Sequence, residues 1–177
     1  MGMLKTVAQA WKVPEIRSKM IFTLLMLVVF RIGSNIPVPN INRSVLAEMF
    51  TGETGLFDLF DLFSGGSFSN FTIFALSITP YITSSIIMQL MTIIIPSLEE
   101  MQKDQDGREK MKEYTFYLSI VLAAIQSLAM GIGFYRGGYL ASKNALGLVI
   151  VVVALVTGAC VLIYLGEEIT KHGVGNG

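Results

Sequence analysis

The sequence predicts an all-α protein, a multi-pass bundle of membrane-spanning helices. Apolar residues make up 53% of the 177 residues and charged residues only 15%, against about 25% in soluble domains. No Asp, Glu, Lys or Arg occurs in three long stretches, at 62–98, 114–135 and 144–166. A spanning helix needs about 20 mainly apolar residues, so each stretch is long enough to cross. This composition argues against a soluble enzyme and against a disordered chain.

Charge and composition also exclude several kinds of site. Lys+Arg and Asp+Glu balance at 13 each, so we expect no direct nucleic-acid binding. A single cysteine, Cys160, and a single histidine, His172, exclude a multi-cysteine or histidine-cluster metal site. The three stretches also lack the carboxylates and basic groups of proton relays and intramembrane active sites. We therefore expect no cofactor, no metal and no enzymatic activity.

The first third of the chain predicts one span and a short re-entrant helix. We expect a cytoplasmic amphipathic segment at 1–18, a first span at 19–36 and an outer loop at 37–67. The outer loop should contain a short helix at 56–63. Pro14 ends the amphipathic segment, and Pro37 and Pro39 end the span. No small-residue cleavage site follows the apolar run, which indicates an uncleaved span rather than a signal peptide. The short helix would measure about 12 Å, too short to cross, so we expect it to be buried or re-entrant.

The rest of the chain predicts three further spans. We expect a second span at 68–98, a cytoplasmic loop at 99–113 and a third span at 114–135. An outer turn at 136–144, a fourth span at 145–165 and a cytoplasmic tail at 166–177 should follow. Pro80 lies inside the second span and predicts a break there. Hydroxyl side chains around Pro80 are able to satisfy freed backbone groups and to bridge helices. The charged loop contains Asp106 and Gly107, which predict a solvated turn, and Gly158 predicts close packing in the fourth span.

The distribution of basic residues predicts the orientation. The N-terminal segment together with Lys19, the loop 99–113 and the tail hold nine of the 13 Lys and Arg residues. Cytoplasmic loops carry the excess of basic residues in membrane proteins. Both ends of this chain are therefore expected on the cytoplasmic side, and the loop 37–67 on the outer side.

Several long strings in the sequence resemble SecY-type protein-translocating channels. They are spread over almost the whole chain: FRIGSNIPVP at 30–39, LFSGG at 62–66, IFALSITPYI at 73–82, QL at 89–90, PSLEE at 96–100, LGEEIT at 165–170 and GVGNG at 173–177. The first string is similar to the end of the family's first span, the second to its plug region and the third to its second span. The sequence departs from the family's pattern at Phe116, where the family often has a basic residue, and at Ser77, where it often has glycine.

The resemblance implies half of an inverted-repeat channel of ten helices with an hourglass pore. By position, it implies an apolar pore ring at Ile78 and Ile82, and a lateral gate at Thr83, Gln89 and Gln126. It implies that the re-entrant helix is a plug with a hinge behind it. The plug side chains would be Leu56, Phe57, Leu59, Phe60, Leu62 and Phe63, and the hinge Ser64, Gly65, Gly66 and Ser67.

The resemblance also implies a function, a location and a set of partners. The function is a passive conduit that passes unfolded polypeptides across the bacterial-type cytoplasmic (inner) membrane and releases membrane helices into it. The implied partners are the remaining half of the channel (the fifth to tenth spans), SecE-like and SecG-like small subunits, a SecA-type motor ATPase or the ribosome, signal sequences, translocating polypeptides and the lipid bilayer. The family continues into a fifth span beyond GVGNG, so we expect this chain to be a fragment or one part of a split chain, inactive alone.

Other interpretations of the same residues remain open at this point. Broken helices with midplane hydroxyls also suit half of an inverted-repeat transporter of small solutes, and a purely structural subunit of a membrane assembly is a third interpretation. Ile78 and Ile82 would then be ordinary core residues, and Gln126 would form a simple bond between helices.

Overall fold

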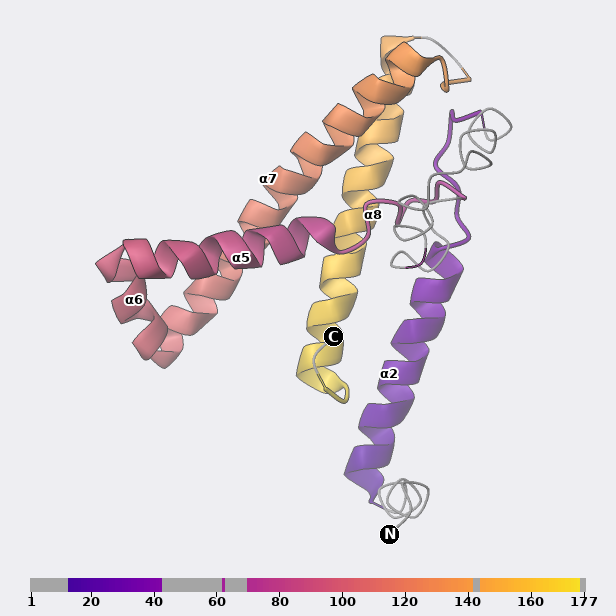
Figure 1. Cartoon of the computed structure of the whole chain (residues 1–177). Helices are drawn as coiled ribbons and strands as arrows, with labels where there is room; N and C mark the ends of the chain where they lie inside the picture. Colours follow the sequence, from indigo (N-terminus) through magenta and orange to yellow (C-terminus); the bar gives the residue numbers. More distant parts are fainter. Residues whose placement is uncertain (1–12, 43–61, 63–69, 142–143, 176–177) are drawn as a thin grey trace.

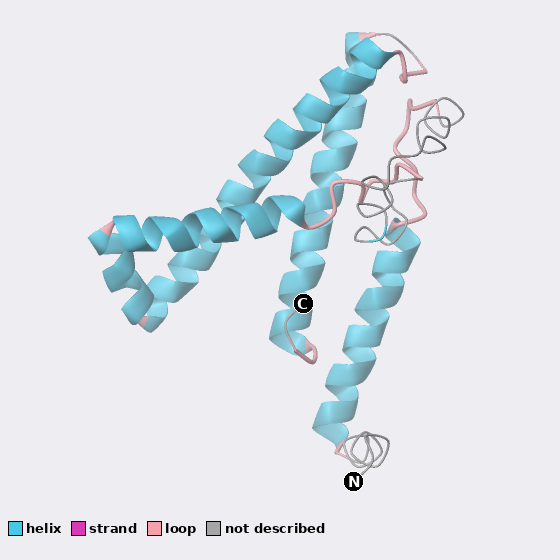
Figure 2. Ribbon diagram, viewed as in Figure 1, coloured by secondary structure: helices cyan, strands magenta, loops and turns pink. Residues whose placement is uncertain are grey.

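Five helices form the described part of the chain, which covers residues 13–42, 62, 70–141 and 144–175 of a computed structural model. The helices are α2 (Pro14–Gly33), α5 (Thr79–Ile94), α6 (Pro96–Lys103), α7 (Gln105–Gly137) and α8 (Ala145–His172). Helix α8 packs against both α2 and α7, and α5 packs on α7. Figure 1 shows α5 starting beside α8 and running away from it, while α6 turns the chain back into α7. Figure 2 shows loops joining this helical frame.

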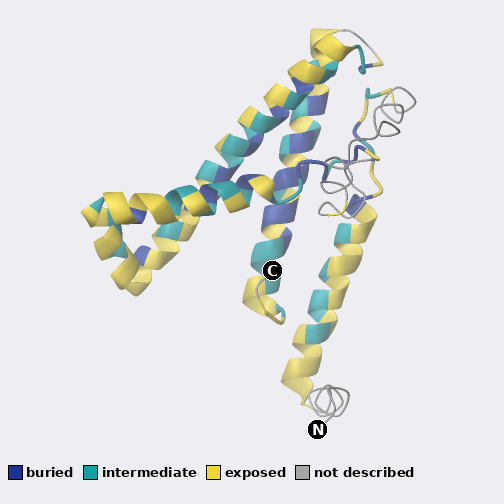
Figure 3. Ribbon diagram, in the orientation of Figure 1, coloured by how far each residue is buried: buried dark blue, intermediate teal, exposed yellow. Residues whose placement is uncertain are grey.

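Helices α7 and α8 form a long regular pair held by small residues. The buried positions of α7 recur every fourth residue, as Thr115, Ser119, Ala123, Ser127 and Gly131. Those of α8 include a matching series, Gly147, Val151, Leu155, Ala159 and Ile163. Residues four apart share a helix face, and small side chains let two backbones approach closely in membranes. A Cβ added to Gly131 would lie 3.1 Å from Val152 Cγ2. The buried residues follow both helices in Figure 3.

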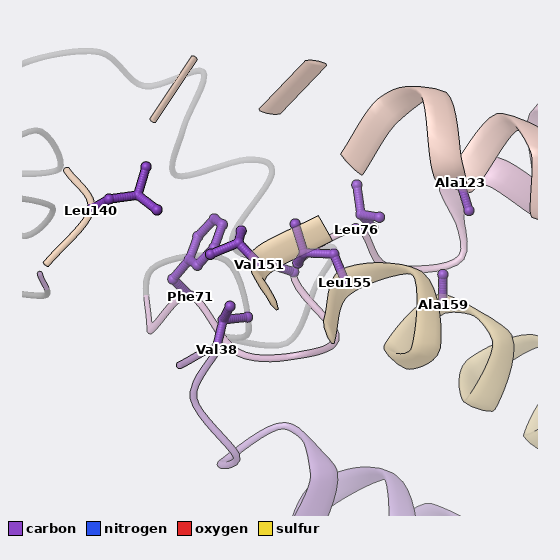
Figure 4. Close-up of a cluster of buried hydrophobic side chains, with 9 residues drawn as sticks. Val38, Phe71, Leu76, Ala123, Leu140, Val151, Leu155 and Ala159 are labelled. Atoms are coloured by element: carbon purple, nitrogen blue, oxygen red, sulfur yellow. The ribbon is translucent and has the colours of Figure 1, made fainter. Parts of the chain in front are cut away.

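A non-helical segment, residues 71–76, lies in the middle of the molecule, and we call it the hub. All of its side chains are buried except that of Ile73, and Phe71 is only 2% exposed. The Phe71 ring meets the edge of Phe134 at a centroid distance of 4.7 Å, and Phe74 stacks on Phe30 at 5.7 Å. Figure 4 shows Phe71 and Leu76 among side chains of α7, α8 and the loops. The hub therefore joins α2, α7 and α8.

The hub backbone is paired and closely packed. The Val38 N–H donates to the Phe71 carbonyl, and the Ile73 N–H donates to the Ile36 carbonyl, both at 3.0 Å. A Cβ added to Gly158, at the middle of α8, would collide with the Ile73 carbonyl group. The close packing predicted at Gly158 is thus confirmed, and the hub crosses α8 at that residue. Non-helical backbone at membrane depth is stable only when it is buried in protein or lines a water-filled cavity.

The second span, predicted at 68–98 with a break near Pro80, is non-helical up to that proline. Residues 70–78 form turns, and α5 begins only at Thr79, with Pro80 in its first turn. Proline is favoured there because the first N–H groups of a helix have no intrahelical partner. A second break, which the sequence did not predict, lies at Ile95, where α5 and α6 meet at 107° and Pro96 begins the next helix. Sixteen residues of α5 span about 24 Å, less than a full crossing.

The loop predicted at 99–113 as a solvated turn is mostly helical. Helix α6 continues to Lys103, and α7 starts at Gln105. Asp104 separates them, and its side chain accepts a hydrogen bond from the Gln105 N–H at 3.0 Å. A Cβ at Gly107 would collide with the Met101 carbonyl, so glycine permits the tight helical hairpin. The connection between α6 and α7 is therefore the single residue Asp104 rather than the predicted loop. The Asp104 cap and the small Gly107 make this short connection possible.

Other predicted boundaries also shift. Pro14 begins α2, in whose first turn it lies. Most of the amphipathic segment predicted before it lies outside the described residues. Helix α2 ends at Gly33 instead of residue 36, and α8 continues through the predicted tail to His172. Within the described residues, α7 and α8 are long and apolar enough to cross a membrane, and the bent pair α5–α6 makes a third if it is counted as one span. Helix α2 carries four charged residues in its 20, so its crossing stays a prediction.

The buried hydroxyls bond within their own helices. Ser84 donates to the Tyr81 carbonyl at 2.8 Å, Ser119 to Phe116 at 2.6 Å, and Ser127 to the Ala124 carbonyl at 3.0 Å. Such back-bonding satisfies a buried hydroxyl locally. The sequence had suggested that hydroxyls of the second span bridge helices. These three serines instead bond to carbonyl groups of their own helices. They act at the interface through their small size.

Candidate functional site

The candidate site begins where the hub passes into α5. Ser77 connects the two and has φ 54°, in the left-handed region that L residues seldom adopt. Its N–H donates to the Phe74 carbonyl at 2.8 Å, which closes the last turn of the hub. The direction in which α5 leaves the buried hub is thus set at a single strained residue.

Ile78 follows directly and is the N-cap residue of α5. Its carbonyl accepts hydrogen bonds from the N–H groups of Tyr81 and Ile82, at 3.0 and 3.1 Å. Pro80 is buried beside them and restricts the backbone of this first turn. Ile78 and Ile82 therefore belong to one stiff helical turn, and a change in its direction moves both side chains together.

A hollow of about 720 Å³ opens between α5, α7 and α8. Ile78, Tyr81 and Ser85 line it from α5. Its other walls combine aromatic and charged side chains from the N-terminal part of α7 and the C-terminal part of α8: Glu109, Lys112, Glu113, Phe116, Tyr117, Ile163, Tyr164, Gly166, Glu167, Thr170 and Lys171. One isoleucine of the predicted ring thus faces a wide hollow that carries charges of both signs.

Ile82 lies on the outer face of α5. Its side chain is 51% exposed and does not line the hollow. Exposed apolar residues continue along the same face as Ile86, Leu90 and Ile93, at the helical spacing of three and four residues. Neither predicted ring residue is part of the buried core, since Ile78 is half-buried and Ile82 exposed. The pore-ring and ordinary-core interpretations of this pair both stay predictions.

The predicted gate residues lie on two helices that pack together. Thr83 and Gln89 are on α5, and Gln126 is on α7. The Thr83 hydroxyl donates to the Thr79 carbonyl at 3.0 Å, and Gln89 is exposed. Gln126 is half-buried, and its side chain makes no hydrogen bond to any other described residue. The bond between helices that was considered for Gln126 is thus absent from the described part of the chain.

The predicted plug and its hinge lie mostly outside the described residues. Of the plug range 56–63 only Leu62 is described, and its side chain is 77% exposed. The hinge range 64–67 lies entirely outside. Both stay predictions.

A second contact region joins the N-terminal half of α2 to the end of α8. The Val174 N–H donates to Thr23 Oγ1 at 3.0 Å, and the rings of Phe22 and His172 meet edge to face at 5.9 Å. His172 also lies 3.1 Å from Glu168 Oε2. These contacts fix the end of α8 against α2. No group of three potential metal ligands occurs in the described parts of the chain.

Sequence reasoning missed the backbone role of Ser77 and the walls of the hollow. A serine in a sequence does not by itself indicate a left-handed backbone. The one signal at this position was that the family often has glycine where this chain has Ser77. Tyr81 and Tyr164 line the hollow from different helices, and their proximity depends on helix packing. Phe116, the other departure, also lines the hollow.

Comparison with known proteins agrees with this geometry. The family model named SecY matches residues 72–177. The protein translocase subunit SecY of Bacillus subtilis is 45% identical over an alignment of 180 residues, which covers 99% of this chain and 41% of that protein. The corresponding protein of Streptomyces coelicolor is 39% identical over an alignment of 189 residues, which covers 99% of this chain and 43% of that protein. The chain thus spans about two fifths of the length of these relatives.

A solved structure shares the fold. Sec61 in the canine ribosome-channel complex from the endoplasmic reticulum superposes with a TM-score of 0.64 and 23% identity, covering 96% of this chain and 38% of that chain. The hub, the short α5 and the long α7–α8 pair therefore form an architecture that also occurs in a protein channel. Since the family model covers more than half of the residues, the chain belongs to the SecY family.

Proposed function

We propose that this chain builds one half of the wall of a protein-conducting channel. The channel passes unfolded polypeptides across the membrane and releases membrane helices into it, as a passive conduit and not as an enzyme. Family membership supports this function, because the relatives are translocase subunits. The same relatives favour a channel over a transporter of small solutes. Since the chain spans about two fifths of their length, the remaining half must come from the fifth to tenth spans.

The observation that carries the proposal is the placement of two branched apolar side chains at the start of α5. Ile78 faces the hollow and Ile82 is exposed, and the hub before them crosses α8 at its middle, by Gly158. If α8 crosses the bilayer, the two isoleucines lie near mid-depth. An apolar ring there grips an extended polypeptide without fixed hydrogen bonds, and when it is closed it excludes water and ions by dewetting.

The plug and gate complete the proposed channel. The helix at 56–63, swinging on the hinge 64–67, closes the outer funnel. Support comes from the similar fold of a SecY protein whose plug domain stabilises the closed state, with a TM-score of 0.61. Thr83, Gln89 and Gln126 border a lateral gate. Their helices α5 and α7 pack together and expose apolar residues such as Ile86 and Ile125.

The proposed surroundings follow from the channel function. The chain sits in the bacterial-type cytoplasmic membrane with both of its ends in the cytoplasm, which the excess of basic residues there supports. It assembles with SecE-like and SecG-like small subunits, and it works with a SecA-type motor ATPase or a ribosome. Signal sequences and translocating polypeptides are its cargo.

Crosslinking to an arrested cargo tests the proposal. Ile78→Cys and Ile82→Cys are made separately in a Cys160→Ser background, within the whole channel complex, and a secretory polypeptide with one cysteine is arrested in transit. We expect disulfide formation at both positions, whereas Val153→Cys on the exposed face of α8 should remain unlinked. Competition by a small solute without any crosslink would contradict the channel and support a transporter.

The ring itself is tested by ion leak. Replacing both isoleucines, Ile78→Gly with Ile82→Gly, removes the side chains that dewet the closed pore. We expect a raised ion conductance of the reconstituted, cargo-free complex. Unchanged conductance would refute the ring. Deleting residues 56–64 should also raise leak and relax the stringency for signal sequences, and if both stay unchanged the plug assignment is wrong.

A further inference from the structure

Ser77 lies between the buried hub and a helix that packs on α7. The hub before it is buried, and Gly158 and the Ile36 carbonyl hold its backbone in place. Helix α5 after it packs on α7 and α6 and exposes a whole apolar face. The hub cannot shift without breaking these contacts. The course of the chain after the hub therefore depends on the backbone angles of Ser77.

The left-handed backbone of Ser77 has a large geometric effect. A change of φ from 54° to a right-handed helical value near −63° is a rotation of roughly 115° about the N–Cα bond. The first turn of α5 would change direction with this rotation, beginning with Ile78. Because the carbonyl of Ile78 is bonded to the Tyr81 and Ile82 N–H groups, both isoleucines would move as one unit.

We propose that Ser77 is a positioning residue, whose left-handed backbone directs the first turn of α5 so that Ile78 and Ile82 reach the pore. This inference rests on the proposed function of the two isoleucines. The serine side chain has no part in the pore itself. The absence of a branch at Cβ lets the backbone hold φ near 54°, since a β-branched residue at such an angle is a genuine outlier.

The test compares three substitutions in the whole channel complex, in a Cys160→Ser background. Ser77→Val introduces a β-branch that opposes the left-handed angle, and Ser77→Gly permits that angle at no steric cost. Ser97→Val is the matched control, because Ser97 is exposed in α6, away from the hollow. Spin labels at Ile86→Cys on α5 and Val153→Cys on α8 report the orientation of α5, and both residues are exposed and outside the proposed ring.

We expect Ser77→Val to change the distance between the labels by several ångström and to raise ion leak several-fold. Ser77→Gly and Ser97→Val should leave the label distance as it is in the parent. A loss of packing alone would lower the thermal stability without a new, well-defined label distance. Unchanged distance and leak in Ser77→Val would overturn the positioning role.

The two proposals fail in different ways. A changed label distance with unchanged leak would support the positioning of α5 by Ser77 and contradict the ring assignment of the isoleucines. If Ser77→Val does not assemble, Ser77→Thr, which is β-branched but retains the hydroxyl, decides the question. It should change the distance in the same direction, and an unchanged distance in an assembled Ser77→Thr complex would overturn the inference.

Discussion

The α7–α8 pair and the hub hold the molecule together in different ways. The pair is regular, its small buried residues recur every fourth position, and its hydroxyls bond within their own helices. The hub has no regular structure, and its backbone bonds reach other segments, as from Val38 to Phe71 and from Ile73 to Ile36. The long helices thus satisfy their own backbone groups, whereas the hub combines internal turn bonds with backbone bonds to its neighbours, which also bury it.

The largest expected loss of stability comes from removing a buried side chain of the hub. Phe71→Ala removes a buried ring that packs on Phe134, and such a cavity costs about 4 kcal/mol. Denaturant unfolding of the detergent-solubilised chain measures the loss. Tyr117→Ala on the exposed face of α7 is the control and should change stability little. A similar cost for both substitutions would erase the distinction between the hub and the helix pair.

The next effect compares two glycines that receive the same methyl group. At Gly158 an added Cβ collides with the Ile73 carbonyl group, while at Gly133 on α7 it meets nothing within 4 Å. Gly158→Ala should therefore destabilise the fold by about 2 kcal/mol through overpacking, and Gly133→Ala should stabilise it by about 0.5 kcal/mol through helix propensity. The midpoints of thermal unfolding in detergent should shift in opposite directions. Shifts of the same sign would show that the hub does not press on α8.

A third comparison makes the same substitution in the two regions, Ser77→Gly after the hub and Ser127→Gly in α7. Ser77 has a left-handed backbone, which costs an L residue about 1 kcal/mol, so glycine should stabilise by about that amount. Ser127 is buried in a regular helix, where glycine should cost about 1 kcal/mol. Equilibrium unfolding of each variant measures the two signs. A stabilising Ser127→Gly or a destabilising Ser77→Gly would contradict this account of the backbone.

The smallest effect concerns the contact between α2 and the end of α8. Thr23→Val keeps the shape of the side chain but removes the oxygen that accepts the Val174 N–H, at an expected cost of about 1 kcal/mol or less. Hydrogen exchange of the amides at 173–175 should quicken. Thr23→Ser retains the acceptor and should exchange like the parent, so equal rates in the two variants would show that this bond is not formed.

The regular part of the fold was predictable from the sequence alone. The charge-free stretch at 114–135 lies entirely within α7, and the stretch at 144–166 lies within α8 except for its first residue, Asn144. A long apolar run needs only its own backbone to become a helix. The signal at Gly158 also predicted a close approach, although not of which segment. The assignment of Ile78 and Ile82 to a pore ring could be inferred only from the strings shared with the family.

Tertiary contacts decided the remainder. Residues 71–76 are as apolar as the helical part of the second span. They are not helical because Phe30 and Phe134 pack against their rings and the backbone at 36–38 forms hydrogen bonds with theirs. Likewise, no local pattern predicts the left-handed backbone of Ser77. The free-energy cost of this conformation is offset by burial of the hub before it and by packing of α5 on α7 after it. Hydrophobic composition by itself determined that this chain is helical and membrane-embedded. Where the helices stop, and which side chains face the hollow, depended on contacts between residues far apart in the chain, since only these repay the loss of regular backbone bonding.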